Sequence, residues 1–139
     1  MQDLCNNIKV VRAISPTRVT DNTAQTSQAV DGANFDSVTY VLAVGTLADA
    51  DMTLAVEVQE CDTSGGSYTA VADADLIGTE AGAALIFSDD NEQVKIGYIG
   101  KKRYTKLVVT PSGNSGNADM CAVAILGHGR NSPLSTQGT

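Results

Sequence analysis

The side chains in this chain that are best suited to chemistry are carboxylates that stand in close pairs. They occur in Asp49-Ala50-Asp51, Asp73-Ala74-Asp75 and Asp89-Asp90-Asn91-Glu92, each in a predicted loop. Oxygen ligands of this kind suit Ca²⁺, which takes six to eight of them. None of the three matches the twelve-residue calcium loop between two helices. We therefore expect solvated acidic loops, with calcium binding as an alternative.

Nucleophilic and metal-binding side chains are few. His128 is the only histidine, and no G-x-S-x-G nucleophile motif accompanies it. Cys5, Cys61 and Cys121 are about sixty residues apart, without the paired spacing of a zinc site. Free cysteines are usually core residues, so we expect these three to be buried and inert. The sequence predicts no enzymatic activity, no metal and no cofactor.

Charge is distributed unevenly along the chain. Between Val19 and Val94 there are fourteen Asp and Glu residues and no Lys or Arg, and all nine basic residues lie outside that segment. A net charge of −7 and the absence of Trp argue against a nucleic-acid partner, which needs cations for phosphates and aromatic rings for bases. We expect an acidic exterior with a small basic remainder, which suits docking against a charged partner.

A short basic run is the clearest candidate for such docking. Four of the nine basic residues fall within six positions, Lys101 to Lys106. The simplest interpretation is a solvated hairpin tip; the functional one is a docking patch for an acidic surface, where charges steer encounter and orient the partner. The candidate interface consists of Arg12, Lys101, Lys102, Arg103, Lys106, His128 and Arg130, with Arg12 and Arg130 included on the condition that the end strands lie nearby.

These residues must be positioned by β-strands, because period-two alternation recurs along the chain and sustained helical periodicity does not. Apolar residues at 54, 56 and 58 alternate with Ala55, Glu57 and Gln59, which predicts one dry and one wet face. Ser15-Pro16 is expected to end the first strand, and 72–77 is the one plausible helical turn. The expected strands are 8–14, 37–44, 54–58, 68–71, 94–98, 104–110 and 120–127.

About eight to ten short strands in 139 residues predict one all-β domain, an antiparallel β-sandwich. The strand pattern fits either a jelly-roll topology or an immunoglobulin-like sandwich. The polar segments 1–7 and 130–139 are expected to be an N-terminal arm and a C-terminal tail outside the core, which become ordered on a neighbour in an assembly. The opening residues do not resemble a signal peptide, and the longest apolar run, Met120 to Leu126, is far too short to span a membrane.

Four phrases of the sequence resemble a known family. They are DLCNNIKVV at 3–11, VQECDTSGGSYTAV at 58–71, GYIGKKRY at 97–104 and GHGRNSP at 127–133. Together they are similar to small virion proteins encoded near the major capsid protein of tailed bacteriophages. The nearest functional analogy is the capsid cement, or decoration, protein of short-tailed phages. The likeness spans nearly the whole chain, although no single phrase is a mechanistic signature.

The resemblance implies a jelly-roll subunit that forms a homodimer, binds the major capsid protein and sits on the outer surface of the virion. Such a protein would be made in the reducing cytoplasm of the bacterial host, with no membrane and no direct nucleic-acid partner. The family supplies no catalytic residues, so the candidate interface rests on charge and position alone. Two alternatives remain open. One is a head–tail completion or tail structural protein. The other is a carbohydrate- or calcium-binding module that uses the acidic loops with Tyr40, Tyr68, Tyr98 or Tyr104.

Overall fold

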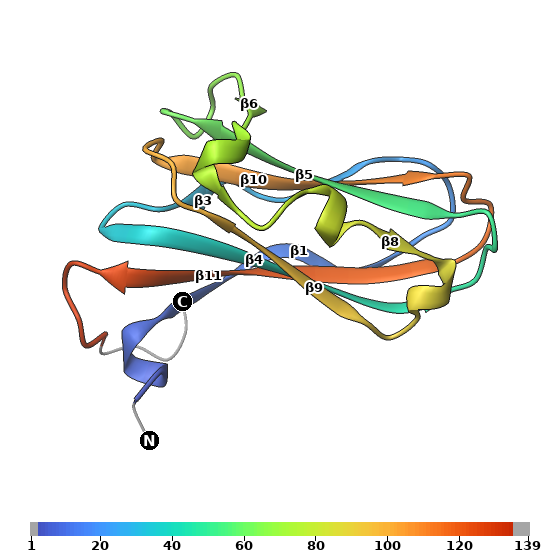
Figure 1. The fold of residues 1–139 in the computed structure, drawn as a ribbon, viewed down its shortest axis with the longest axis horizontal. Helices are drawn as coiled ribbons and strands as arrows, with labels where there is room; N and C mark the ends of the chain where they lie inside the picture. The colour runs from blue at the N-terminus through green and yellow to red at the C-terminus, as the bar shows by residue number, and fades with distance from the viewer. Residues whose placement is uncertain (1–2, 135–139) are drawn as a thin grey trace.

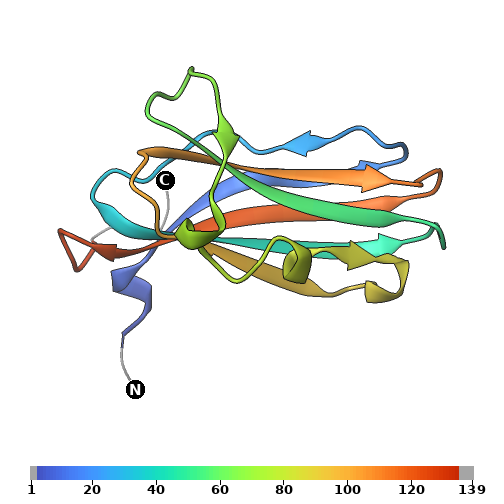
Figure 2. The same ribbon diagram turned by 45° about the horizontal axis from the view of Figure 1, so that its top comes forward.

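Two antiparallel sheets packed face to face make up the computed structural model, which describes residues 3–134 (Figures 1 and 2). The strands are β1 (Lys9–Val19), β2 (Gln25–Thr26), β3 (Val30–Asp31), β4 (Phe35–Leu47), β5 (Thr53–Cys61), β6 (Thr69–Ala70), β7 (Leu76–Ile77), β8 (Leu85–Ile86), β9 (Gln93–Tyr98), β10 (Tyr104–Ser112) and β11 (Ala118–Gly129). Short 3₁₀ helices are η1 (Cys5–Asn7), η2 (Asp73–Asp75), η3 (Ala81–Ala83) and η4 (Phe87–Asp89). Within the described residues, no helix has the length and apolarity needed to cross a bilayer.

The strand order decides between the two expected topologies. The five-stranded sheet runs β1-β11-β4-β9-β7, so the first strand lies beside the last. The six-stranded sheet runs β2-β10-β5-β6, with β3 also paired to β10 and β8 to β5. Two Greek keys wound into a jelly roll produce this order, whereas an immunoglobulin-like sandwich groups strands ABED against CFG. The predicted antiparallel jelly-roll sandwich is confirmed, and the immunoglobulin-like alternative does not apply.

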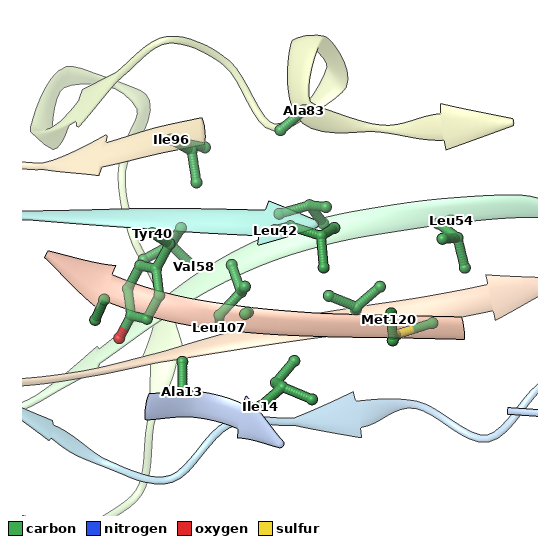
Figure 3. Packing of buried hydrophobic residues seen from close by; sticks show 14 of the residues in the cluster. Ala13, Ile14, Tyr40, Leu42, Leu54, Val58, Ala83, Ile96, Leu107 and Met120 are labelled. Carbon is green, nitrogen blue, oxygen red and sulfur yellow. The ribbon is translucent and has the colours of Figure 1, made fainter. Parts of the chain in front are cut away.

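The core lies between the sheets and is built from every second residue of the long strands (Figure 3). Tyr40 and Leu42 point inward from β4, and Leu54 and Val58 point inward from β5. Burying a side chain of this size contributes about 1.5–3 kcal/mol. The Tyr40 hydroxyl lies 2.8 Å from Thr105 Oγ1, so the polar group at the centre is hydrogen-bonded. Burial raises the pKa of Tyr40 and keeps it neutral.

The first strand differs from the prediction, because β1 continues through Ser15-Pro16 to Val19. Its register with β11 shifts between Arg12 and Ile14 and again between Ile14 and Thr17. Pro16 has no amide hydrogen to donate, but β1 is the edge of its sheet and the irregular pairing accommodates the proline. The sequence correctly predicted a strand here and placed its end too early.

The two terminal segments lie at the same end of the sandwich (Figure 1). The Leu134 amide donates to the Asn6 carbonyl at 2.6 Å, which joins the described parts of the expected arm and tail. Asp3 Oδ1 accepts the Asn6 amide at 3.1 Å and holds the first turn of η1. Residues 1–2 and 135–139 of the expected arm and tail lie outside the described residues. The helical turn expected at 72–77 is confirmed as η2, followed directly by β7.

Candidate interaction surface

The residues from Gly100 to Arg103, here called the basic end loop, connect β9 to β10. These strands belong to different sheets, so the loop crosses the end of the sandwich and is not the hairpin tip that the sequence suggested. The Tyr98 hydroxyl accepts the Lys102 amide at 2.9 Å and donates to Glu60 Oε2 at 2.6 Å. Burial and the Glu60 hydrogen bond raise the pKa of Tyr98. Gly100 is needed here, because a Cβ would lie 2.5 Å from the Tyr98 ring.

Carboxylates neutralise most of the positive charge at this end. The ion pairs are Arg103–Asp31 at 2.8 Å, Lys102–Asp62 at 2.5 Å and Arg130–Asp36 at 3.5 Å. The hydrogen bonds from Arg103 lower the pKa of Asp31. All three pairs are largely exposed and contribute little to stability, but each one cancels a charge that the sequence analysis counted as available for docking. Lys101 has no such partner among residues 3–134.

The structure brings four of the seven predicted interface residues together. Lys101, Lys102, Arg103 and Arg130 line one open hollow of about 610 Å³, with Asp36 among them. Proximity of Arg130 to the basic run, which the sequence left conditional, is therefore confirmed.

The other three predicted residues lie elsewhere on the molecule. The Lys106 ammonium is 4.2 Å from the centroid of the Tyr68 ring, a cation–π contact on the six-stranded sheet. Arg12 projects outward from the five-stranded sheet. His128 Nδ1 lies 3.0 Å from Ser37 Oγ, and its φ of 54° places it in the left-handed region at the end of β11. The proximity of Arg12 to the basic run, which was conditional on strand packing, is not found.

The acidic loops use their carboxylates to bind backbone amides. Asp49 accepts from the Asp51 amide at 2.9 Å and from the Ser115 hydroxyl at 2.7 Å, and the hydrogen bond from Ser115 is the main cause that lowers the Asp49 pKa. Asp90 accepts the Leu47 amide at 2.8 Å. In the described part of the chain, no three His, Cys, Asp or Glu side chains are grouped so as to hold a metal ion. Asp49 and Asp90 thus cap loops, whereas no side-chain hydrogen bond is found for the Asp73 and Asp75 pair in the described residues.

Only two of the four tyrosines that the sequence analysis offers as a carbohydrate-binding face, Tyr68 and Tyr104, lie at the surface. Tyr40 and Tyr98 are buried in the core. Tyr68 and Tyr104 are half-buried, and each ring is covered by a cation, with the Arg103 guanidinium 5.0 Å from the Tyr104 centroid. Tyr40, Tyr98 and Tyr104 lie in strands, where alternate residues point to opposite faces, so their positions along the strand determine whether each ring faces the core or the exterior.

The prediction of buried cysteines is wrong. Cys5 is exposed in η1, and Cys61 and Cys121 are half-buried. Cys121 points outward from β11 because its neighbours Met120 and Ala122 point into the core. Cys121 is part of an outward surface that the sequence analysis did not predict.

That surface is the outward side of the five-stranded sheet, where β1, β11, β4 and β9 lie side by side (Figure 1). The pairing register aligns its outward residues in rows across the strands. The rows are Val10–Ile125–Thr39–Gly97, then Arg12–Val123–Val41–Lys95, then Cys121–Ala43–Gln93. We call this set the apolar face.

The apolar face is aliphatic at its centre and carries charge only at its sides. Val123 and Val41 stand in the middle row, between Arg12 on β1 and Lys95 on β9. The two cations are three strands apart, about 14 Å. Neither has an ion-pair partner among the described residues. The face itself contains no carboxylate, and Asp119, the next outward residue on β11, is paired with Arg18. A contiguous apolar surface with unpaired charges at its rim is typical of a protein interaction site.

A shallow hollow of about 420 Å³ extends the apolar face beyond Gly97 towards β7. Ile77 and Ile99 form its apolar walls and are 59% and 47% exposed. Lys95 and His128 also line it. Gly97 leaves the space open, because a Cβ there would approach the Ile77 Cβ to 3.0 Å.

The sequence does contain a signal for this face. The segments 37–44 and 120–126, in β4 and β11, are nearly continuous apolar runs, whereas 54–59 in β5 alternates apolar and polar residues. Strands covered on both faces have continuous runs, and strands with one face in water alternate. The sequence analysis predicts strands at 37–44 and 120–127 but does not infer from their apolar runs that the outward face is also apolar.

No model of a known protein family matches the chain, and no curated protein is similar to it in sequence. Solved structures are similar in fold. The PBSX exported protein XepA has a TM-score of 0.59 and 14% identity, covering 100% of this chain and 43% of that one. The structure of infectious bursal disease virus, Gx strain, has a TM-score of 0.51 and 14% identity, covering 91% of this chain and 34% of that one. The chain thus spans less than half the length of either protein.

The structural neighbours with TM-scores below 0.5 are of several kinds and include Bacillus endospore appendages. The SPBc2 prophage-derived protein YomS has a TM-score of 0.44 and 11% identity, covering 86% of this chain and 93% of that one. The CBM22-1-GH10 modules of Clostridium thermocellum xylanase 10B have a TM-score of 0.48 and 11% identity, covering 95% of this chain and 28% of that one. The neighbours therefore include a phage-derived protein and a protein with a carbohydrate-binding module. At these TM-scores and identities the two similarities carry no conclusion about this chain.

Proposed function

We propose that this protein is a non-enzymatic structural component of a tailed-phage virion that binds the outer surface of the capsid and cements neighbouring major-capsid subunits. The observation that carries the proposal is the apolar face, a broad outward surface on a rigid sheet whose composition suits contact with another protein. The jelly-roll fold and the four phrases that resemble phage cement proteins support the same conclusion. The net charge of −7 suits the outside of a shell better than contact with packaged DNA.

Cementing follows from simple thermodynamics. A homodimer that contacts two capsid subunits gains avidity, because its second contact forms within an existing complex. A ligand that binds the assembled shell and not the separate subunits stabilises the shell by mass action. Bridges of this kind oppose the internal pressure of a packaged genome.

Cryo-EM of particles that carry the protein tests the proposal through location and copy number. We expect hundreds of copies on the outer surface, placed across boundaries between capsomers. About six or twelve copies on the portal axis would instead assign the protein to a head–tail or tail ring and overturn cementing.

A binding assay tests the same proposal in solution. Empty shells assembled from the major capsid protein of the same phage are mixed with purified protein and sedimented. We expect saturable uptake and a higher temperature of shell disassembly. A rise in the protein's own Tm on addition of xylan oligosaccharides, with no uptake by shells, would favour the carbohydrate-binding alternative.

A further inference from the structure

We infer that the apolar face is the docking surface of this protein, and that its partner is a protein surface with an apolar centre and carboxylates opposite Arg12 and Lys95. The inference rests on the proposed function for the source of that partner, the assembled shell. It adds that the outward side of the five-stranded sheet makes the contact, and that the shell surface there is apolar with carboxylates at its edges.

The first argument is that β4 and β11 are apolar on both sides. Inward residues of β4, such as Tyr40 and Leu42, are in the core, and the outward Val41 is also aliphatic. The same holds on β11, where Val123 and Ile125 face outward. Strands of this composition are normally covered on both faces, and in the described residues only the inward side is covered by the second sheet.

The second argument is electrostatic. The chain as a whole carries −7, yet its apolar face has two cations and no carboxylate. An acidic surface is therefore attracted to the apolar face, which contributes to orienting the encounter. Arg12 and Lys95 each need a carboxylate opposite, because a cation covered without a counter-charge loses hydration and gains nothing in return.

The same charges argue against a second copy of this chain as the occupant. If two copies stack with a two-fold axis along the strands, Arg12 of one copy lies opposite Lys95 of the other. If the axis runs across the strands, each cation meets its own counterpart. A crossed arrangement leaves all four cations without a counter-charge, since the face contains no carboxylate. The proposed homodimer must therefore use a different surface.

The hollow beyond Gly97 supplies a point of anchorage. Its walls, Ile77 and Ile99, are among the most exposed large apolar residues of the described chain. An apolar side chain of the partner fits a recess of this kind, and such anchors dominate the affinity of protein interfaces. Lys95 lines the hollow and also stands at the rim of the apolar face. One segment of the partner can therefore place an apolar side chain in the hollow and a carboxylate beside Lys95.

The experiment compares two double charge reversals of equal size. Arg12→Glu with Lys95→Glu changes the apolar face, and Lys101→Glu with Lys106→Glu changes two cations elsewhere. Both are assayed for uptake by empty shells of the same phage at several salt concentrations, after thermal melting has shown that they fold. Arg12→Gln with Lys95→Gln provides a milder variant.

We expect wild-type uptake to weaken as salt rises. Reversal on the apolar face should lower the affinity at least about thirtyfold at low salt and flatten the salt dependence, whereas the control should change it less than about threefold. Loss of uptake in the control alone would place docking at Lys101 or Lys106, away from the apolar face, and overturn the inference. So would equal uptake by both variants.

Further outcomes separate this inference from the proposed function. If shells take up no wild-type protein, the proposed function fails, and the assigned partner fails with it. Normal wild-type uptake with normal uptake of the Arg12→Glu, Lys95→Glu variant overturns the inference alone. A free dimer in sedimentation velocity that this variant dissociates would show that a second copy covers the face. Binding to phosphatidylserine vesicles that the variant abolishes would show that a membrane does.

Discussion

The two sheets share one core, yet their outward sides differ in chemistry. On the five-stranded sheet the central outward residues are Val41, Val123 and Ile125. On the six-stranded sheet the outward residues of β5 and β10 are largely polar, and we call this side the polar face. It includes Thr53, Ala55, Glu57, Gln59, Lys106, Val108 and Thr110. Strand geometry is the same on both sides, so the difference lies in the residues, and the proposed docking at the apolar face would account for it.

The polar groups of the two faces also differ in how they are satisfied. On the polar face Gln59 donates to Glu57 Oε1 at 2.6 Å, and Lys106 lies against the Tyr68 ring. On the apolar face Arg12 and Lys95 have no ion-pair partner in the described chain. On the polar face these side chains therefore have partners within the molecule, whereas the two cations of the apolar face have none among the described residues.

The largest effect is expected from neighbouring residues of β4 that point in opposite directions. Leu42→Ala removes a core side chain and should lower the free energy of unfolding by about 2–5 kcal/mol. Val41→Ala, on the apolar face, should cost about 1 kcal/mol or less in the free protein. Denaturant unfolding of both variants measures the difference. An equal loss would show that the apolar face is already covered in the free protein.

Next comes a comparison between the two outward faces. Val123→Glu places a carboxylate at the centre of the apolar face, and Val108→Glu does the same at a half-buried position of the polar face. A carboxylate at 123 stands opposite Arg12 and cancels the charge offered to the partner, and it also removes the apolar centre of the face. Val123→Glu should therefore weaken uptake by shells about a hundredfold, or about 2.7 kcal/mol. Val108→Glu should weaken it less than about threefold. The reverse ranking would assign docking to the polar face.

A smaller effect is expected from the cation–π contact of the polar face. Lys106→Met keeps the aliphatic stem over the Tyr68 ring and removes the charge, which should lower the free energy of unfolding by about 0.5–1 kcal/mol. Lys101→Met, at a cation with no such ring, should leave stability unchanged. Equal effects in thermal denaturation would mean that the ring contact contributes nothing and that the polar face is less complete than its geometry indicates.

The smallest effect concerns Asp119, which pairs with Arg18 at 2.6 Å beside the apolar face. The hydrogen bonds from Arg18 lower the pKa of Asp119 in the folded protein, so its contribution is present above the unfolded pKa of about 3.9 and is lost as pH falls through the lower folded value. Asp119→Asn should therefore melt slightly below wild type at pH 7, with a gap that closes by about pH 2. Thermal melts from pH 7 to pH 2 measure the gap.

The same variant also sharpens the comparison of faces. Asp119→Asn leaves Arg18 without its counter-charge and makes this side of the molecule more positive. Uptake by shells at low salt should then be equal to or tighter than that of wild type. Weaker uptake would mean that the ion pair itself contacts the partner.

Local patterns were sufficient to predict the β-sandwich and most of its long strands. Alternation in 54–59 reports directly which side chains are dry, because a strand turns every second residue to the same face. The jelly-roll topology was confirmed, but the sequence placed it only as the favoured of two alternatives. Pairing the first strand with the last depends on contacts between distant segments, which no local pattern contains.

Interactions at the candidate sites show the same division between local and distant information. The sequence by itself identified the basic run and its place between two strands. Only the tertiary structure decided that Arg103 meets Asp31, 72 residues away, and that Lys102 meets Asp62, 40 residues away, because folding selects which carboxylates lie opposite. Folding likewise placed Arg12 and Lys95 in one row from distant parts of the chain. The charge and hydropathy of each residue can be taken from the sequence, whereas the strand register that aligns residues into one surface forms only on folding.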